Sequence, residues 1–198
     1  MRQDKQSYEE QLRRKQAAAR KVERMITDLI ERERKRVEAA RRDLAKKSGK
    51  AEPAPLPDKA ISNTKFGKLR GRLPWPVSQG AVVGQFGEHT NPRLGTVTIS
   101  NGIDISTPNG SSLKTVADGT VSMVQYVLGY GNLIIVRHDD GFFTVYAHLS
   151  QMSVKEEQKV KAGQIIGKSG EGISGPILHF ELYYNKKTQN PLHWLTRR

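Results

Sequence analysis

Apolar residues recur every seven positions over the first quarter of the chain. They form two heptad tracks, four residues out of phase: Leu12, Ala19, Ile26 and Ala40, and Ile30, Val37 and Leu44. This spacing predicts one long amphipathic helix over residues 1–50, with the properties of a coiled coil. A lone helix of this length cannot bury its apolar stripe against itself, so we expect it to pack on another surface.

The predicted helix ends where glycine and proline begin. Gly49 is followed by Pro53, Pro55 and Pro57, and proline cannot continue a helix. Alternating prolines keep a segment extended and fairly stiff. Residues 51–67 are therefore predicted to form a Pro-rich linker, which can hold the helix at a distance or let it fold back on the rest of the chain.

After the linker the pattern changes to a period of two. Short apolar runs such as "TVTIS", "NLIIVRH" and "ILHFELYY" alternate with turn signals of the Asn-Gly and Asp-Gly type. These signals stand at Asn101-Gly102, Asn109-Gly110, Asp118-Gly119 and Asp140-Gly141. Because strands of this kind pair through tight turns, residues 68–198 are predicted to form a mainly β, antiparallel domain.

Charge changes this picture little. The chain has 33 Lys and Arg against 20 Asp and Glu, a net charge of +13, and residues 1–50 hold 17 of the basic and 9 of the acidic residues. Acids and bases alternate there at helical spacing, as in Glu31 and Lys35, which stabilises an exposed helix. No aromatic platform accompanies the charge, so nucleic acid is not the expected partner, and an anionic cell wall or membrane suits the basic surface better.

The sequence contains no cysteine, which excludes disulfide bonds and thiolate metal sites. It also lacks an apolar run of membrane-spanning length, and its first residues lack the apolar stretch of a signal peptide. We expect a soluble chain. If it is exported, its signal peptide has been removed or lies outside this sequence.

Two histidines and one aspartate are the candidates for chemistry. His148 and His179 fall on predicted strands, and Asp104 follows an Asn-Gly turn. Alternate side chains of a strand share a face. One such row consists of Ile177, His179, Glu181 and Tyr183. We expect these strands to bring Asp104 and the histidines together, although a catalytic zinc would need a further ligand.

Several segments together resemble a known family. In order and spacing, "NGIDIS", "FFTVYAHLS", "VKAGQIIGKSG" and "ILHFEL" are similar to the LytM, or lysostaphin-like, domain of zinc endopeptidases that cut peptidoglycan cross-bridges. The resemblance covers about residues 68–196. It implies an antiparallel β domain of the LytM type, which is a duplicated hybrid motif-like fold.

The family holds zinc with the His and Asp of an H-x-x-x-D motif and with the second His of an H-x-H motif. Asp104 and His179 match two of these ligands, whereas Ser100 stands in place of the ligand His. Ile177 stands in place of the first His of H-x-H, and His148 matches the remaining catalytic His. A hydroxyl replaces imidazole poorly, and a hydrocarbon cannot transfer a proton. The resemblance therefore implies a degenerate, inactive domain without a cofactor, in which Asp104 and His179 are vestigial metal positions.

Other interpretations of these residues remain open. His89, in the loop "GEHTNP", or the amide oxygen of Asn101 would have to act as a substitute ligand if a metal is held. Alternatively, the Asp104 carboxylate accepts hydrogen bonds from backbone amides of the turn, and His179 is a half-buried strand histidine that hydrogen-bonds a neighbour.

The long helix, the proline linker and the degenerate LytM domain together resemble the murein hydrolase activators of the EnvC family. The segment "GKLRGRLPWPV" is similar to the start of the domain in that family. The resemblance implies a non-catalytic protein of the periplasm or cell envelope that binds and activates N-acetylmuramoyl-L-alanine amidases during daughter-cell separation. It also implies that the coiled coil docks on an FtsE-FtsX-type division complex.

The resemblance further implies a groove that binds the partner at the former metal site. Its expected residues are Ser100, Asn101, Asp104, Tyr130, Leu133, His148, Ile177, His179 and Tyr183. Such a groove suits an amphipathic helix or strand. The chain's own helix has a stripe that is apolar enough to occupy the groove at rest, namely Ile26, Ile30, Val37 and Leu44.

Two other functions stay open. A zinc-dependent peptidoglycan endopeptidase with an atypical ligand set would hold zinc and would lose its activity with the metal. A passive wall-binding module would bind peptidoglycan through the basic surface and leave amidases unaffected.

Overall fold

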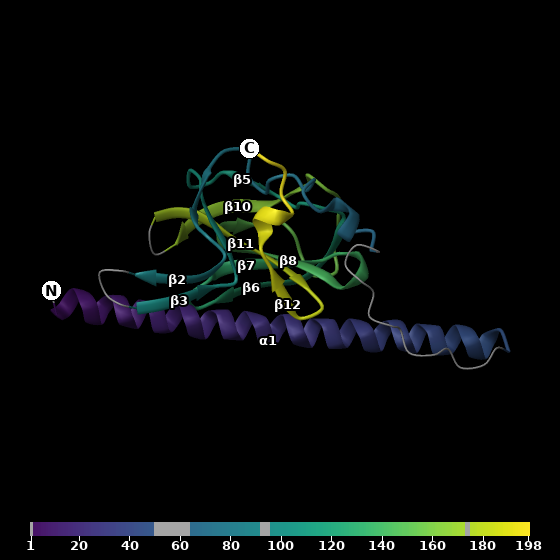
Figure 1. Cartoon of the computed structure of the whole chain (residues 1–198). Coiled ribbons are helices and arrows are strands. Elements are labelled where there is room, and N and C mark those ends of the chain that lie inside the picture. The colour runs from purple at the N-terminus through teal and green to yellow at the C-terminus, as the bar shows by residue number, and fades with distance from the viewer. Residues whose placement is uncertain (1, 50–63, 92–95, 173–174) are drawn as a thin grey trace.

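The computed structural model describes residues 2–49, 64–91, 96–172 and 175–198, and shows one long helix laid along a β domain (Figure 1). The helix, α1, spans Arg2–Lys47, so the prediction of a single long helix is confirmed. Ion pairs between residues four apart, such as Arg34 with Glu38, support it. Within these described ranges, no helix has the length and apolar character needed to cross a membrane.

The β domain is built on one large antiparallel sheet, as the alternating pattern predicts. Its strands run in the order β1-β4-β11-β10-β8-β7-β6-β9, with β12 beside β11 and β5 beside β10. Their bounds are Ala81–Gly84 (β1), Gly102–Ser106 (β4), Ser112–Lys114 (β5), Gly119–Val127 (β6), Gly131–Arg137 (β7), Phe142–Met152 (β8), Lys159–Val160 (β9), Ile165–Gly172 (β10), Gly175–Tyr184 (β11) and Lys187–Gln189 (β12).

Shorter elements complete the domain. A separate hairpin consists of β2 (Gly87–Asn91) and β3 (Thr96–Ser100), and α1 contacts β3. The described residues also include the short helices η2 (Gly67–Leu69), η3 (Asp139–Gly141) and η4 (Pro191–His193).

The central strands bury both of their faces, because alternate side chains point to opposite sides. On β8, Phe142 and Tyr146 enter the main core, while Phe143 and Val145 enter a second apolar cluster. The second cluster includes residues of α1. This two-sided burial explains why the strands are nearly continuous apolar runs in the sequence.

α1 covers the second face with residues four positions apart. Ala18, Val22 and Ile26 are buried there together with residues such as Leu133. Gly129, in the turn between β6 and β7, has a φ of +94°, and a Cβ on it would lie 2.8 Å from the Cβ of Ala18. Glycine therefore permits both the turn and the close approach of the helix.

The docked residues differ from the two heptad tracks of the sequence prediction. Ile26 is fully buried and Ile30 and Val37 are half-buried, whereas Leu44 is 67% exposed. Figure 1 shows the reason for the last value, because the C-terminal end of α1 extends past the β domain. The helix meets a sheet here, so a ridge of residues four apart makes the contact. Coiled-coil pairing of α1 stays a prediction.

Charged residues surround the apolar contact. Lys186 Nζ donates to Glu31 Oε1 of α1 at 2.8 Å, and Arg137 pairs with Glu33 of α1. Exposed ion pairs stabilise a fold by about 0–1 kcal/mol each, less than the burial of an aliphatic side chain. The charged pairs therefore set the rotation and register of the helix, while the apolar residues supply most of the docking free energy.

The predicted linker, residues 51–67, lies largely outside the described residues. At its described end Thr64 and Phe66 are buried, and the rings of Phe66 and Phe142 stack with their centroids 4.5 Å apart. The packing of the β domain thus begins a few residues before the predicted boundary at residue 68.

Replacement of Ile26 by Ala should weaken the docking of α1 by about 2–4 kcal/mol, because it removes a fully buried aliphatic side chain. Leu44→Ala is the matched control, and should change the docking by less than about 0.5 kcal/mol since the side chain is exposed. Hydrogen exchange of the α1 amides measures both effects. Equal exchange in the two variants would contradict the docked arrangement.

Candidate functional site

Asp104 on β4 and His179 on β11 are direct neighbours across the sheet. They are partners in the β4–β11 register, and His179 Nδ1 hydrogen-bonds Asp104 Oδ1 at 2.5 Å. Strand β1 passes close to them at Gly84, where a Cβ would lie 2.7 Å from Asp104 Oδ2. The structure thus brings together the two residues that match metal ligands in the sequence pattern.

A buried glutamate, to which the sequence analysis assigned no role, completes the site. Glu181 is fully buried, and its Oε1 accepts hydrogen bonds from His179 Nε2 at 3.0 Å and Tyr130 Oη at 2.6 Å. Its Oε2 accepts one from Tyr183 Oη at 3.0 Å. Burial and the charge of Glu181 raise the pKa of both tyrosines, which keeps their hydroxyls protonated. The sequence did carry one signal for this role. Glu181 is a carboxylate in an apolar row of a strand, and a buried carboxylate must find buried partners.

His179 lies between two carboxylates and is held in its charged form. Burial disfavours the imidazolium, but the hydrogen bonds and charges of Asp104 and Glu181 outweigh it and raise the pKa of His179 to about 9. Burial likewise disfavours ionised Asp104. The His179 imidazolium and the Lys15 ammonium nevertheless hold the pKa of Asp104 well below its usual range. Both groups are therefore charged at neutral pH.

His148 stands beside this network as a neutral imidazole. Its ring centroid lies 6.3 Å from that of His179. Burial, together with the charge of His179, lowers the pKa of His148 to about 4. Its backbone φ is +61°, a left-handed conformation that is unfavourable for residues other than glycine. Strain of this kind is often found at functional sites.

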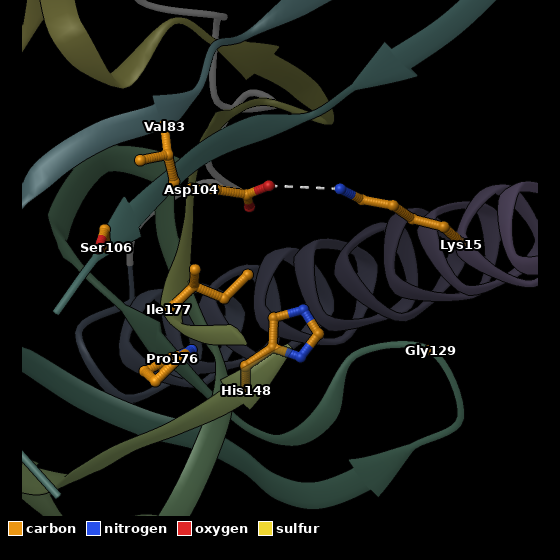
Figure 2. Close-up of a pocket in the computed structure, with 8 residues that line it drawn as sticks. All are labelled: Lys15, Val83, Asp104, Ser106, Gly129, His148, Pro176 and Ile177. Atoms are coloured by element: carbon orange, nitrogen blue, oxygen red, sulfur yellow. Dashed lines mark hydrogen bonds and ion pairs between the residues drawn. The ribbon is translucent and has the colours of Figure 1, made fainter. Parts of the chain in front are cut away.

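A cavity of about 260 Å³ lies beside Asp104 (Figure 2). Its lining residues are Lys15, Val83, Asp104, Ser106, Gly129, His148, Pro176 and Ile177. Lys15 reaches the cavity from α1, and its Nζ lies 3.3 Å from Asp104 Oδ2. The helix therefore contributes both a wall and a cation to the cavity.

Six of the predicted groove residues divide between this cavity and the helix interface. Those that line the cavity are Asp104, His148 and Ile177. Those that lie in the cluster under α1 are Tyr130, Leu133 and Tyr183, and each is at most 2% exposed. The chain's own helix thus covers part of the surface that the sequence predicts to be a groove.

Ser100, Asn101 and His89 make other contacts. Ser100 Oγ donates to the carbonyl oxygen two residues further on, at 3.0 Å. Asn101 Nδ2 donates to Glu23 Oε1 of α1 at 2.9 Å. His89 lies on β2, where its Nε2 is 2.6 Å from the carbonyl oxygen of Gln85. These three residues are outside the cavity lining, so the structure does not place His89 beside Asp104 and His148 at the cavity.

These side chains do not fit the zinc site that the LytM resemblance describes. Both ring nitrogens of His179 hydrogen-bond carboxylates, whereas a zinc ligand binds the metal through one of them. Ile177 provides only hydrocarbon at the cavity. In the part of the chain that the structure describes, no three His, Cys, Asp or Glu side chains are arranged to hold a metal ion.

The charged network should make the protein less stable as the pH rises above neutrality. The pKa of His179 is about 9 in the fold against 6.5 ordinarily, so the network stabilises the fold fully below about pH 6.5. This stabilisation, of about 2–3 kcal/mol, is lost as the pH rises through about 9. Chemical denaturation at these two ends of the range measures the change.

His179→Gln is the matched control, because it keeps a polar side chain and removes the titrating group. This variant should be less stable than wild type near pH 6.5 and should vary much less with pH. A wild-type protein that is equally stable at both ends of the range would contradict the charged state of His179.

The β domain resembles known proteins in sequence and in fold. Residues 98–191 match the model of Peptidase family M23. The murein hydrolase activator NlpD of Escherichia coli is 41% identical over 126 residues, which is 63% of this chain and 31% of that protein. The lipoprotein NlpD of Yersinia enterocolitica is 42% identical over 97 residues, which is 48% of this chain and 100% of that protein.

A solved structure shares the fold. The crystal structure of a zinc-containing peptidase from Vibrio cholerae matches with a TM-score of 0.56 and 30% identity, over 62% of this chain and 40% of that one. The prediction of a LytM-type β domain is thereby confirmed. This chain spans about a third of the length of the Escherichia coli relative. Because it also covers the whole Yersinia lipoprotein, at well above 30% identity, this chain belongs to peptidase family M23.

Proposed function

We propose that this chain is a non-catalytic activator of cell-wall amidases, the N-acetylmuramoyl-L-alanine amidases, and binds its partner through the site at Asp104. The observation that carries the proposal is the hydrogen bond of 2.5 Å between His179 and Asp104, the two vestigial metal positions. A catalytic zinc needs three protein ligands, and these two residues are bound to each other. The relative named murein hydrolase activator NlpD supports the same class of function.

We infer the cellular setting from the resemblance to the EnvC family. The protein acts in the periplasm or cell envelope during cell division, and α1 docks on an FtsE-FtsX-type complex. Peptidoglycan is a further ligand, because a chain with a net charge of +13 is attracted to anionic wall polymers. Nucleic acid has no part in the proposal.

α1 restrains the activator at rest. The helix covers Tyr130, Leu133 and Tyr183, and Lys15 occupies one side of the cavity. A partner that binds these surfaces must first displace α1. Activation is then a shift from a closed to an open population, driven by the affinity of the partner for the open form.

Addition of the full chain to a purified cell-wall amidase should increase the release of labelled fragments from peptidoglycan, and the chain alone should release none. Val83→Asp should reduce this increase by about tenfold, because Val83 is 63% exposed and lines the cavity. Ile165→Asp is the matched control, since Ile165 is 51% exposed and outside the cavity lining. A dye-release assay with labelled peptidoglycan compares the full chain with both variants.

The same assay tests the restraint by α1. Ile26→Ala, which loosens the helix, should raise the activation, and Leu44→Ala should leave it unchanged. An amidase rate that does not respond to the full chain or to Ile26→Ala refutes the proposal. Binding to peptidoglycan without such a response would identify a passive wall-binding module.

Two observations favour a second function, that of a zinc-dependent peptidoglycan endopeptidase with an atypical ligand set. The fold is similar to that of a zinc-containing peptidase at 30% identity. His148, which matches a catalytic His of the family, also lines the cavity. This function would require a substitute ligand to join Asp104 and His179.

Elemental analysis of the purified protein separates the two functions. We expect less than about 0.1 zinc per chain, because two protein ligands do not retain zinc against buffer. Near-stoichiometric zinc, lost in His179→Ala together with peptidoglycan cleavage, would favour the endopeptidase. Loss of that zinc in His89→Ala would then identify the substitute ligand.

A further inference from the structure

Lys15 places a positive charge beside a residue that matches a metal ligand. Its ammonium lies 3.3 Å from Asp104 Oδ2, while Asp104 Oδ1 hydrogen-bonds His179. The side chains of Lys15 and Asp104 are 38% and 15% exposed, so water screens the pair only in part. Figure 2 shows the ammonium directed at the carboxylate from the helix side of the cavity.

Charge balance explains why a cation belongs there. Asp104 and Glu181 bring two negative charges, and the imidazolium of His179 balances one of them. A largely buried carboxylate without a cation is unfavourable. The residues present do not fit zinc. An ammonium meets the same electrostatic demand through a charge-assisted hydrogen bond in place of coordination.

The residues that follow Lys15 on α1 match the surface next to the cavity. Ala18, three positions later, packs at Gly129, where a Cβ would lie only 2.8 Å from its own. Val22 and Ile26, seven and eleven positions after Lys15, are fully buried. These spacings place all four side chains on one face of a helix. The surface under α1 therefore contacts a lysine, a small residue and two aliphatic residues at defined spacings, and not merely an apolar stripe.

We propose that the cavity at Asp104 is a binding site for a lysine side chain presented by an amphipathic helix. The helix carries a small residue three positions after the lysine and aliphatic residues seven and eleven positions after it. α1 fills the site in the resting protein, and a partner helix with the same spacing fills it when α1 is displaced. That the partner is a cell-wall amidase rests on the proposed function, whereas the lysine site does not.

Charge reversal of Lys15 in the full chain tests the site within one molecule. Lys15→Glu should make the α1 amides exchange with solvent at least about tenfold faster, because two carboxylates then face each other. Lys21→Glu is the matched control, with the same charge change at an exposed position of the same helix. It should stay within about twofold of wild type. Equal exchange in the two variants overturns the proposal.

A synthetic peptide with the sequence of residues 10–31 tests the site between molecules. The acceptor is the full-length Lys15→Glu chain, whose own helix competes less well. The unmodified peptide should bind, and a peptide carrying Lys15→Glu should bind at least about tenfold more weakly. A peptide carrying Lys21→Glu should bind like the unmodified one. Fluorescence anisotropy of the labelled peptides measures the dissociation constants.

Equal binding of the unmodified and Lys15→Glu peptides overturns the proposal. Hydrogen exchange of the sheet amides verifies that the acceptor is folded. If it is not, the full-length Lys15→Met chain, which removes the charge without reversing it, serves as the acceptor. Neither readout contains an amidase, so an amidase that fails to respond would refute the proposed function and leave the lysine site intact.

Discussion

A fully buried carboxylate and a largely buried one need positive partners, and the arrangement of the whole site follows from that need. Asp104 and Glu181 lie on either side of His179, which their charges keep protonated. One imidazolium cannot balance two carboxylates, and the second cation, Lys15, comes from 89 residues earlier in the chain. An unpaired charge in the interior costs several kcal/mol. The charge balance of the β domain therefore depends on the position of α1.

The interface between α1 and the sheet has a small apolar centre, which is compatible with the proposed undocking of the helix. Its apolar centre consists of a few side chains, chiefly Ala18, Val22 and Ile26. The surrounding polar contacts, such as Asn101 with Glu23, set the register at little gain in stability. The proposed undocking of α1 would leave the main core intact, because that core lies on the opposite face of the central strands.

Membership of peptidase family M23 defines the fold but does not determine the function, since one fold supports several functions. The strands still bring an aspartate and two histidines together, as in a metal site. Ser100 instead bonds a backbone carbonyl, and Ile177 places hydrocarbon at the cavity. The same backbone then presents a carboxylate that accepts an ammonium, next to an apolar surface that accepts a helix. A few side chains are thus enough to set the chemistry of a site on this scaffold, without a change of fold.

Local patterns in the sequence were sufficient for the elements of this fold and for part of its site. Heptad spacing predicted the helix, alternation and turn pairs predicted the strands, and the motif around Asp104 and His179 anticipated their contact. The heptad pattern was insufficient to choose between a second helix and a sheet as the surface for α1, because an amphipathic stripe fits either. The sequence also gave no sign that Lys15 would meet Asp104, and it did not indicate which partners Glu181 would find. Those contacts join residues distant in the chain, so they exist only once the folded backbone brings their side chains within bonding distance.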